Sequence, residues 1–405
     1  MFLARVAALA ACLTHPISGL QLAPARPLRR LGRVAAAAPT AAPSAAENPF
    51  ELVRDDLKLM KGRIRALVER TLDSGDGEKS SSGKSHPLLQ EAAREFFERR
   101  ERAFRPCVVL LAARAVSPHL PADEAVSPRQ CLLAEIVEMM STAQLVHDSV
   151  LEDDEEGEEG NVAHRTYSQN AGNKISVLAG DFLLARCSVA LSQLGDLGVV
   201  RLMATALESM VLGGVLKAQA AGAGADKLSD LDHYLERVSL KTSALIADAC
   251  RSAAILGGEA PDGPYATAVY DYASALGVAY QLNADSIAYR GQVAEDAPLA
   301  DALSAPPVIL AAAADEGCRA LIYEAMEGGA TLAAVAAAVD AAGGAEAAQA
   351  LSTERAAAAK VALAPLPESP AKAALLRMAD FVCEPDQLGL QREKYIAAEA
   401  KKKAA

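Results

Sequence analysis

The sequence contains no tryptophan, and aromatic residues make up only 4% of its 405 positions. This scarcity argues against an aromatic-rich β-sandwich. Alanine dominates many stretches instead, and it favours helices that pack closely through small side chains. Because 51% of the residues are hydrophobic, the chain has enough apolar side chains for a large core. We therefore predict an all-α globular protein.

The sequence also lacks any Cys-x-x-Cys pair, and its seven cysteines are scattered along the chain. An odd number at irregular spacing is typical of reduced core thiols rather than of a disulfide framework or a zinc site. Basic residues are outnumbered, with 40 Lys and Arg against 52 Asp and Glu, for a net charge of −12. Because nucleic acid needs a basic surface, it is not an expected partner.

The first 46 residues contain no acidic residue, and their basic residues are Arg5, Arg26, Arg29, Arg30 and Arg33. The apolar run over 6–13 is too short to span a membrane, and we expect no transmembrane segment. This pattern predicts an organelle targeting region over 1–46, with a plastid as the destination and a mitochondrion as the alternative. Its removal leaves 35 basic and 52 acidic residues, so that the net charge becomes −17.

Apolar residues recur at helical spacing over most of the remaining chain. The predicted helices cover 51–72, 88–116, 127–151, 174–194, 199–220, 228–256, 265–289 and the alanine-rich part beyond 307. Gly, Ser and Pro interrupt this pattern at the joins, most clearly over 73–87. We predict one continuous helical domain over 47–390 and a charged tail over 391–405.

Acidic residues stand near the ends of two of these helices. Asp148 and Glu152 are four residues apart and therefore lie on one helix face, where two carboxylates can share a divalent cation. From this segment alone, a charged helix end is the more frequent explanation of the pair. The later helix carries Gln281, Asn283 and Asp285, and a buried, hydrogen-bonded aspartate would account for that acid.

Several segments together resemble the trans-polyprenyl diphosphate synthases, most closely the plastid solanesyl type. They include AFRPCVVLLAARA over 103–115, LAEIVEMMSTAQLVHD over 133–148, GNKISVLAGDFLLARC over 172–187 and LKTSALIADACRSAAILGG over 240–258. The similarity extends over 48–383. It implies a single large helical bundle with a central cavity, prenyl diphosphates as ligands and a dimeric protein.

In that family, two facing aspartate-rich motifs hold magnesium ions that clamp the diphosphate of the allylic substrate. The resemblance implies that the metal ligands left in this chain are Asp148, Glu152 and Asp285. The first motif has Ser149 in place of its middle acid. The second has Ala284 and Ala288 in place of its outer acids. Magnesium is therefore the implied cofactor, at a weakened site.

The resemblance also implies a set of diphosphate-binding residues: Arg102, Arg105, His147, Lys241, Thr242 and Gln281. Other positions depart from the family, because Ala103 replaces an arginine, Gly214 an acid and Lys217 a glutamine. Where the family has paired arginines, this chain has seven acids over 152–159. A solvated acidic loop is a simpler interpretation of that stretch than a new metal site.

Five residues before Asp148, the family places the side chain that limits product length. Here that residue is Ala143, which implies an open chain-length pocket. Small residues that let helices pack closely would look the same.

These residues predict a catalytically impaired subunit of isoprenoid biosynthesis that pairs with an active prenyl diphosphate synthase. One alternative is a divergent but active solanesyl-type prenyltransferase, which would condense isopentenyl diphosphate with an allylic diphosphate. Another is a protein that holds prenyl diphosphates without reaction. A homodimer is the alternative assembly.

Overall fold

The computed structural model describes residues 48–69, 103–117, 126–148, 162–222, 230–294 and 302–384. All of them belong to the unit Glu47–Ala405. These residues form helices and turns, with no strand among them, which confirms the all-α prediction. The predicted targeting region over 1–46 and the predicted tail over 391–405 lie outside the described residues.

The first helices are α2 (Arg54–Glu69), α4 (Phe104–Val116), α5 (Pro128–Asp148), α6 (Val162–Gln193) and α7 (Leu197–Gly222). The central ones are α8 (Leu231–Val238), the π-helical turn η2 (Ser239–Ser243), α9 (Ala244–Leu256) and α10 (Pro264–Ala294). The last are α12 (Pro306–Ala314), α13 (Glu316–Met326), α14 (Leu332–Ala341), α15 (Gly344–Ala362) and α16 (Pro370–Phe381). Most begin and end within a few residues of the predicted limits.

Local chemistry sets several of these boundaries. The side chain of Asp230 accepts a hydrogen bond from the backbone N–H of His233 at 2.7 Å and thereby caps α8. Asp315 and Thr331 cap α13 and α14 in the same way. Proline in the first turn starts α12 and α16, where its missing N–H costs no helical hydrogen bond.

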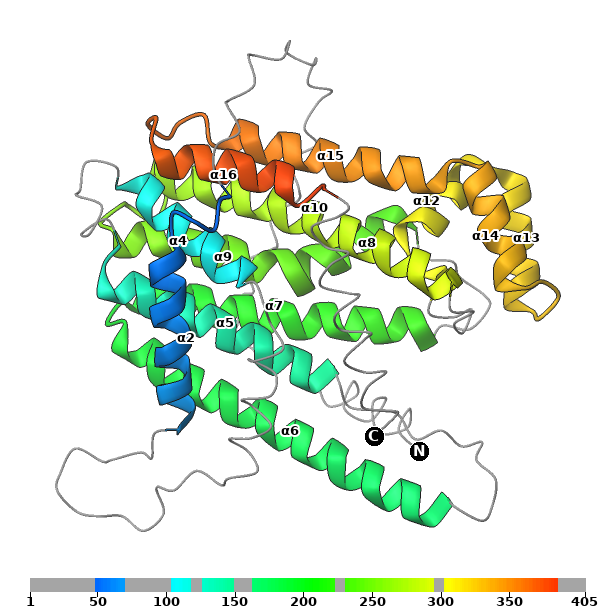
Figure 1. The fold of residues 1–405 in the computed structure, drawn as a ribbon, viewed down its shortest axis with the longest axis horizontal. Helices are drawn as coiled ribbons and strands as arrows, with labels where there is room; N and C mark the ends of the chain where they lie inside the picture. Colours follow the sequence, from blue (N-terminus) through cyan, green and yellow to red (C-terminus); the bar gives the residue numbers. More distant parts are fainter. Residues whose placement is uncertain are drawn as a thin grey trace, which may run out of the picture. The chain divides into compact units, whose positions relative to one another are not determined.

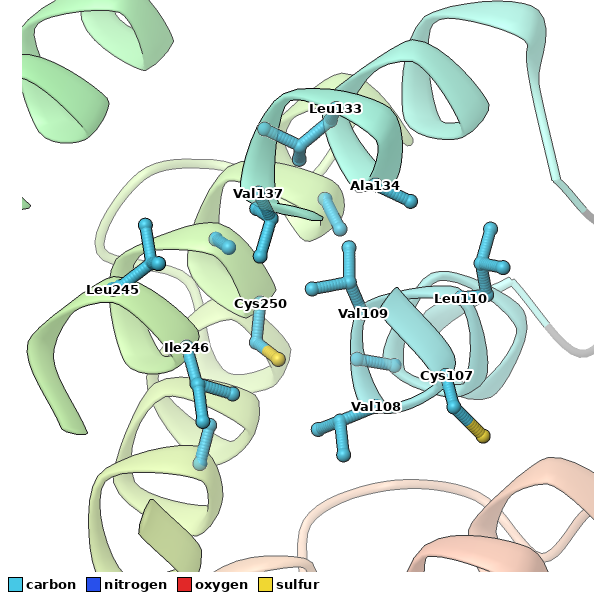
Figure 2. Close-up of a cluster of buried hydrophobic side chains, with 14 of the residues drawn as sticks. Cys107, Val108, Val109, Leu110, Leu133, Ala134, Val137, Leu245, Ile246 and Cys250 are labelled. Carbon is cyan, nitrogen blue, oxygen red and sulfur yellow. The ribbon is translucent and has the colours of Figure 1, made fainter. Parts of the chain in front are cut away.

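The main core is built from α4, α5 and α9, whose apolar side chains meet in Figure 2. The labelled residues there are Cys107, Val108, Val109, Leu110, Leu133, Ala134, Val137, Leu245, Ile246 and Cys250, and all are at most 1% exposed. The six cysteines within the described residues are free. Burial raises the pKa of the Cys107 and Cys250 thiols, so they act as small apolar side chains.

The remaining helices pack around this core. Helix α10 runs along α9 and α15, α6 packs on α5, and α7 packs on α9 and η2. Helices α12, α13 and α14 contact one another and form a group at one end of the bundle, coloured yellow to orange in Figure 1. Around Val308, Ile322 and Val335 these three helices form a second apolar cluster, which also includes Tyr289 of α10.

Two segments are long and apolar enough to cross a membrane by length and composition, Asn173–Gln193 in α6 and Leu197–Lys217 in α7. Length and composition do not separate such segments from helices of a folded domain. In the 18-residue apolar window of each segment, only 33% and 28% of the residues are buried, so much of the apolar surface faces outward.

Candidate functional site

The predicted site residues converge on η2, the π-helical turn between α8 and α9. The Nζ of Lys241 lies 2.7 Å from the Oδ2 of Asp148, at the end of α5. The Oγ1 of the next residue, Thr242, donates to the Oε1 of Gln281 on α10 at 3.0 Å. A π-turn inserts one residue into a helix and is frequent at functional sites. Here it lets consecutive side chains reach two different helices.

Asp285 on α10 is held by two neutral donors. The hydroxyl of Tyr234 donates to its Oδ2 at 2.8 Å, and the Nε2 of Gln281 donates to its Oδ1 at 2.7 Å. Burial raises the pKa of the Asp285 carboxyl, while these two hydrogen bonds and the charges of Arg237 and Lys217 oppose that rise. Each oxygen of this carboxylate therefore already has a protein partner.

These contacts join the two acidic positions through η2. Asp148 contacts Lys241, Thr242 follows in sequence, and Gln281 connects Thr242 to Asp285. Carboxylates from α5 and α10, 137 positions apart in sequence, thus meet adjacent residues of one turn. Asp148 and Asp285 are thus linked to each other through η2 and Gln281.

Two glycines permit the close helix contacts behind this arrangement. A Cβ at Gly213 on α7 would lie 2.6 Å from the backbone N of Lys241, closer than such atoms can approach. A Cβ at Gly180 on α6 would lie 2.1 Å from the Nε2 of His147. Glycine therefore lets α7 contact η2 and lets the His147 ring lie against α6.

Side chains in the last turn of α5 hold the end of this helix, both within α5 and against α6. The Nε2 of Gln144 donates to the Oδ1 of Asp148 at 2.9 Å. The Nε2 of His147 lies 3.3 Å from the carbonyl O of Val177 and 3.4 Å from the Oδ1 of Asp181, both on α6. His147 thus faces α6, while Asp148 faces η2.

Of the remaining predicted site residues, the structure describes some and not others. Arg105 lies in the first turn of α4, next to Phe104, whose ring stacks on Tyr280 of α10 at 4.6 Å between centroids. Ala143 is fully buried in the main core. Arg102, Ser149, Glu152 and the acidic stretch over 152–159 lie outside the described residues.

Within the described residues, no group of three or more His, Cys, Asp or Glu side chains could hold a metal ion. The structure describes every residue of the second motif, 284–288. The side chains of Ala284 and Ala288 contribute no oxygen ligand there. The residues present at this position do not fit a metal site of several carboxylates.

Sequence reasoning missed Tyr234 and Arg237, which shape the surroundings of Asp285. The Arg237 guanidinium lies 5.1 Å from the centroid of the Tyr234 ring. The spacing from Tyr234 to Arg237 to Lys241 is three and then four residues, which places them along one side of a helix. That spacing was available in the sequence once Lys241 had been singled out.

Comparisons with known proteins agree with this fold. The model of the family described as polyprenyl synthetase matches residues 86–330. Solanesyl-diphosphate synthase 1, mitochondrial, of Oryza sativa subsp. japonica is 36% identical over 259 residues, which cover 60% of this chain and 54% of that protein. Solanesyl diphosphate synthase 3, chloroplastic/mitochondrial, of Arabidopsis thaliana is 32% identical over 258 residues, which cover 60% of this chain and 55% of that protein. The matched part therefore spans about half the length of these curated relatives.

A solved structure shows the same architecture. The decaprenyl diphosphate synthase from Rhodobacter capsulatus superposes with a TM-score of 0.64 at 28% sequence identity. The superposition covers 83% of this chain and 97% of that one.

Proposed function

The chain belongs to the polyprenyl synthetase family, and we propose that it is a catalytically impaired subunit that works with an active prenyl diphosphate synthase. Membership places it in isoprenoid biosynthesis, with the trans-prenyltransferase fold. Its proposed ligands are prenyl diphosphates, held near the residues gathered at η2.

One observation carries the proposal of impaired catalysis. Asp285 is the sole acid of its motif, and both of its oxygens accept hydrogen bonds from Tyr234 and Gln281. A bound metal supplies several kcal/mol of charge stabilisation as a diphosphate leaves. Since each ~1.4 kcal/mol changes a rate about tenfold, loss of one ion predicts a rate lower by roughly a thousandfold or more.

The proposed cofactor, if a metal is bound, is a weakly held Mg²⁺ at the first motif. Asp148 would be its ligand there together with Glu152, and Ser149 cannot replace a carboxylate. Asp148 already forms an ion pair with Lys241, which an incoming cation would have to displace. This competition supports weak rather than strong magnesium binding.

The outward faces of α6 and α7 support a partner subunit. Seven of the eleven large hydrophobic side chains that are exposed among the described residues belong to these helices: Val177, Leu178, Val189, Leu197, Val211, Leu212 and Val215. We call this set the α6–α7 apolar surface. Such a concentration on two consecutive helices is typical of a protein interface. We propose that a second chain of the same fold covers it.

The proposed location is an organelle, either a plastid or a mitochondrion. The arginine-rich, acid-free sequence over 1–46 supports import. Of the two solanesyl diphosphate synthases given above, the one from Oryza sativa is named as mitochondrial and the one from Arabidopsis thaliana as chloroplastic/mitochondrial. A fluorescent fusion of residues 1–46 would identify the compartment.

The decisive experiment measures Mg²⁺-dependent incorporation of labelled isopentenyl diphosphate into prenyl products. The purified chain is assayed alone, beside an active synthase, and in a mixture of the two. We expect negligible product from the chain alone and altered yield or product length in the mixture. Turnover by the isolated chain comparable with that of the active synthase would favour the alternative, a divergent solanesyl-type prenyltransferase.

A further inference from the structure

Two cationic side chains of the chain itself act on Asp285, the acid of the second motif. The guanidinium of Arg237 stacks on Tyr234, whose hydroxyl donates to Asp285. Arg237 and Lys217 both interact electrostatically with Asp285. Two positive side chains therefore act on this carboxylate, in addition to the two neutral donors.

Lys217 reaches this position from α7. It stands one helical turn after Gly213, the residue whose backbone lies against Lys241. Residues four apart share a helix face, so Lys217 lies on the same side of α7 as the contact with η2. Helix α7 also packs against α8, which carries Arg237. Because Lys217 is exposed, its ammonium group is open to a ligand from solvent.

Neither Lys217 nor Arg237 forms an ion pair with any carboxylate in the part of the chain that the structure describes. For Arg237 this matters, because the residue is only 7% exposed. A mostly buried guanidinium without a carboxylate within bonding distance attracts an anion more strongly than a fully hydrated one does. An anionic ligand would supply the missing partner.

A metal ion fits poorly at the same place. It would have to displace the Tyr234 and Gln281 hydrogen bonds from the two oxygens of Asp285. It would also be repelled by Lys217 and Arg237, and no second carboxylate of the motif is present to offset that repulsion. The charge balance therefore favours an anion over a divalent cation.

We propose that Lys217, Arg237 and Lys241 bind the diphosphate group of a prenyl diphosphate directly, without a metal ion. The ligand class rests on the proposed function. Ammonium and guanidinium groups donate strong, charge-assisted hydrogen bonds to phosphate oxygens. Lys241 has three donors, and its contact with Asp148 uses one of them.

The test measures binding of geranylgeranyl diphosphate to the full chain by isothermal titration calorimetry, once with excess EDTA and once with Mg²⁺. We expect the two dissociation constants to agree within about threefold, because the binding groups carry their charge without a metal. Lys217→Gln should weaken binding in EDTA by roughly tenfold, as expected for one charge-assisted contact. This exposed position can be changed without disturbing the core.

Lys58→Gln on α2 is the matched control, because it removes one exposed lysine far along the chain from these residues. It should leave the dissociation constant unchanged. Binding that disappears in EDTA and returns with Mg²⁺ would overturn the proposal, as would equal binding by the wild type and Lys217→Gln. Neither result bears on the proposed lack of turnover, which the incorporation assay decides separately.

Discussion

At the scale of single residues, the fold treats its partly buried carboxylates in different ways. Asp285 has two hydrogen-bond donors on its oxygens. Asp248 on α9 is half-buried, and burial raises its pKa to about 7, with Arg251 only partly opposing that rise. Desolvation disfavours the charged form of an acid, so the fold resists ionisation of Asp248.

This raised pKa predicts a pH-dependent loss of stability. The folded state holds the Asp248 proton more tightly than the unfolded state, whose pKa is near 3.8. Unfolding therefore becomes easier as the pH rises from about 4 to about 7, and the effect is constant above that range. Asp248→Asn should raise the free energy of unfolding at pH 8 by about 2 kcal/mol and by almost nothing at pH 4.

Urea denaturation of the variant and the wild type at both pH values would check this prediction. Asp55→Asn is the control, since the Asp55 side chain is 92% exposed. An equal gain for Asp248→Asn at both pH values would show that packing, rather than ionisation, causes the effect.

At the scale of helices, the contact between α7 and η2 holds Lys241 at the site. Gly213 and Gly214 are neighbours in α7 but face different surroundings. A Cβ at Gly213 would meet the backbone of Lys241 at 2.6 Å, whereas a Cβ at Gly214 would have nothing within 4 Å. Replacing each glycine by alanine should therefore change the free energy of unfolding in opposite directions.

Gly213→Ala should lower the free energy of unfolding by roughly 1–3 kcal/mol, because the added methyl group forces α7 and η2 apart. Gly214→Ala should raise it by up to about 1 kcal/mol, because alanine has the higher helix propensity. Thermal or urea denaturation of both variants measures the difference. Similar stabilities would mean that α7 can shift at little cost and that η2 is not held by this contact.

The helices themselves could be predicted from the sequence because their apolar residues repeat at the helical period. The π-turn could not, since the pattern over 228–256 continues through it without a break. An inserted residue of this kind depends on contacts from other helices, here Gly213 on α7 and Gln281 on α10. Helix periodicity carries no information on such contacts.

The site residues could be predicted only where the resemblance to the polyprenyl diphosphate synthases pointed to them. That resemblance singled out Asp148, Lys241 and Gln281, which the structure brings together around η2. It treated Lys217 as a lost contact, whereas the structure gives it an electrostatic effect on Asp285. A departure from a family pattern can remove one interaction and create another, and only the surrounding charges show which occurred.

At the scale of the whole molecule, the proposed subunit role would account for both the incomplete acidic motifs and the apolar outer helices. A chain that retained only the fold would need its helical core and its partner surface, but not its metal ligands. The core around α4, α5 and α9 is closely packed, and the α6–α7 apolar surface remains exposed in the single chain. A partner that covered that surface would remove apolar area from water, and each Å² buried would stabilise the complex by about 25 cal/mol.

Charged substitutions on this surface should therefore prevent association. Val211 and Val215 lie one turn apart on α7 and are 55% and 47% exposed. Val211→Glu combined with Val215→Glu should raise the dimer dissociation constant at least a hundredfold, equivalent to about 3 kcal/mol, because the interface would bury two unpaired carboxylates. Analytical ultracentrifugation of the chain, alone and mixed with an active synthase, measures this. Val361→Glu on α15, where the valine is 61% exposed, is the control and should associate like the wild type. If the α7 variant still forms the same dimers, its partner must bind another face of the molecule.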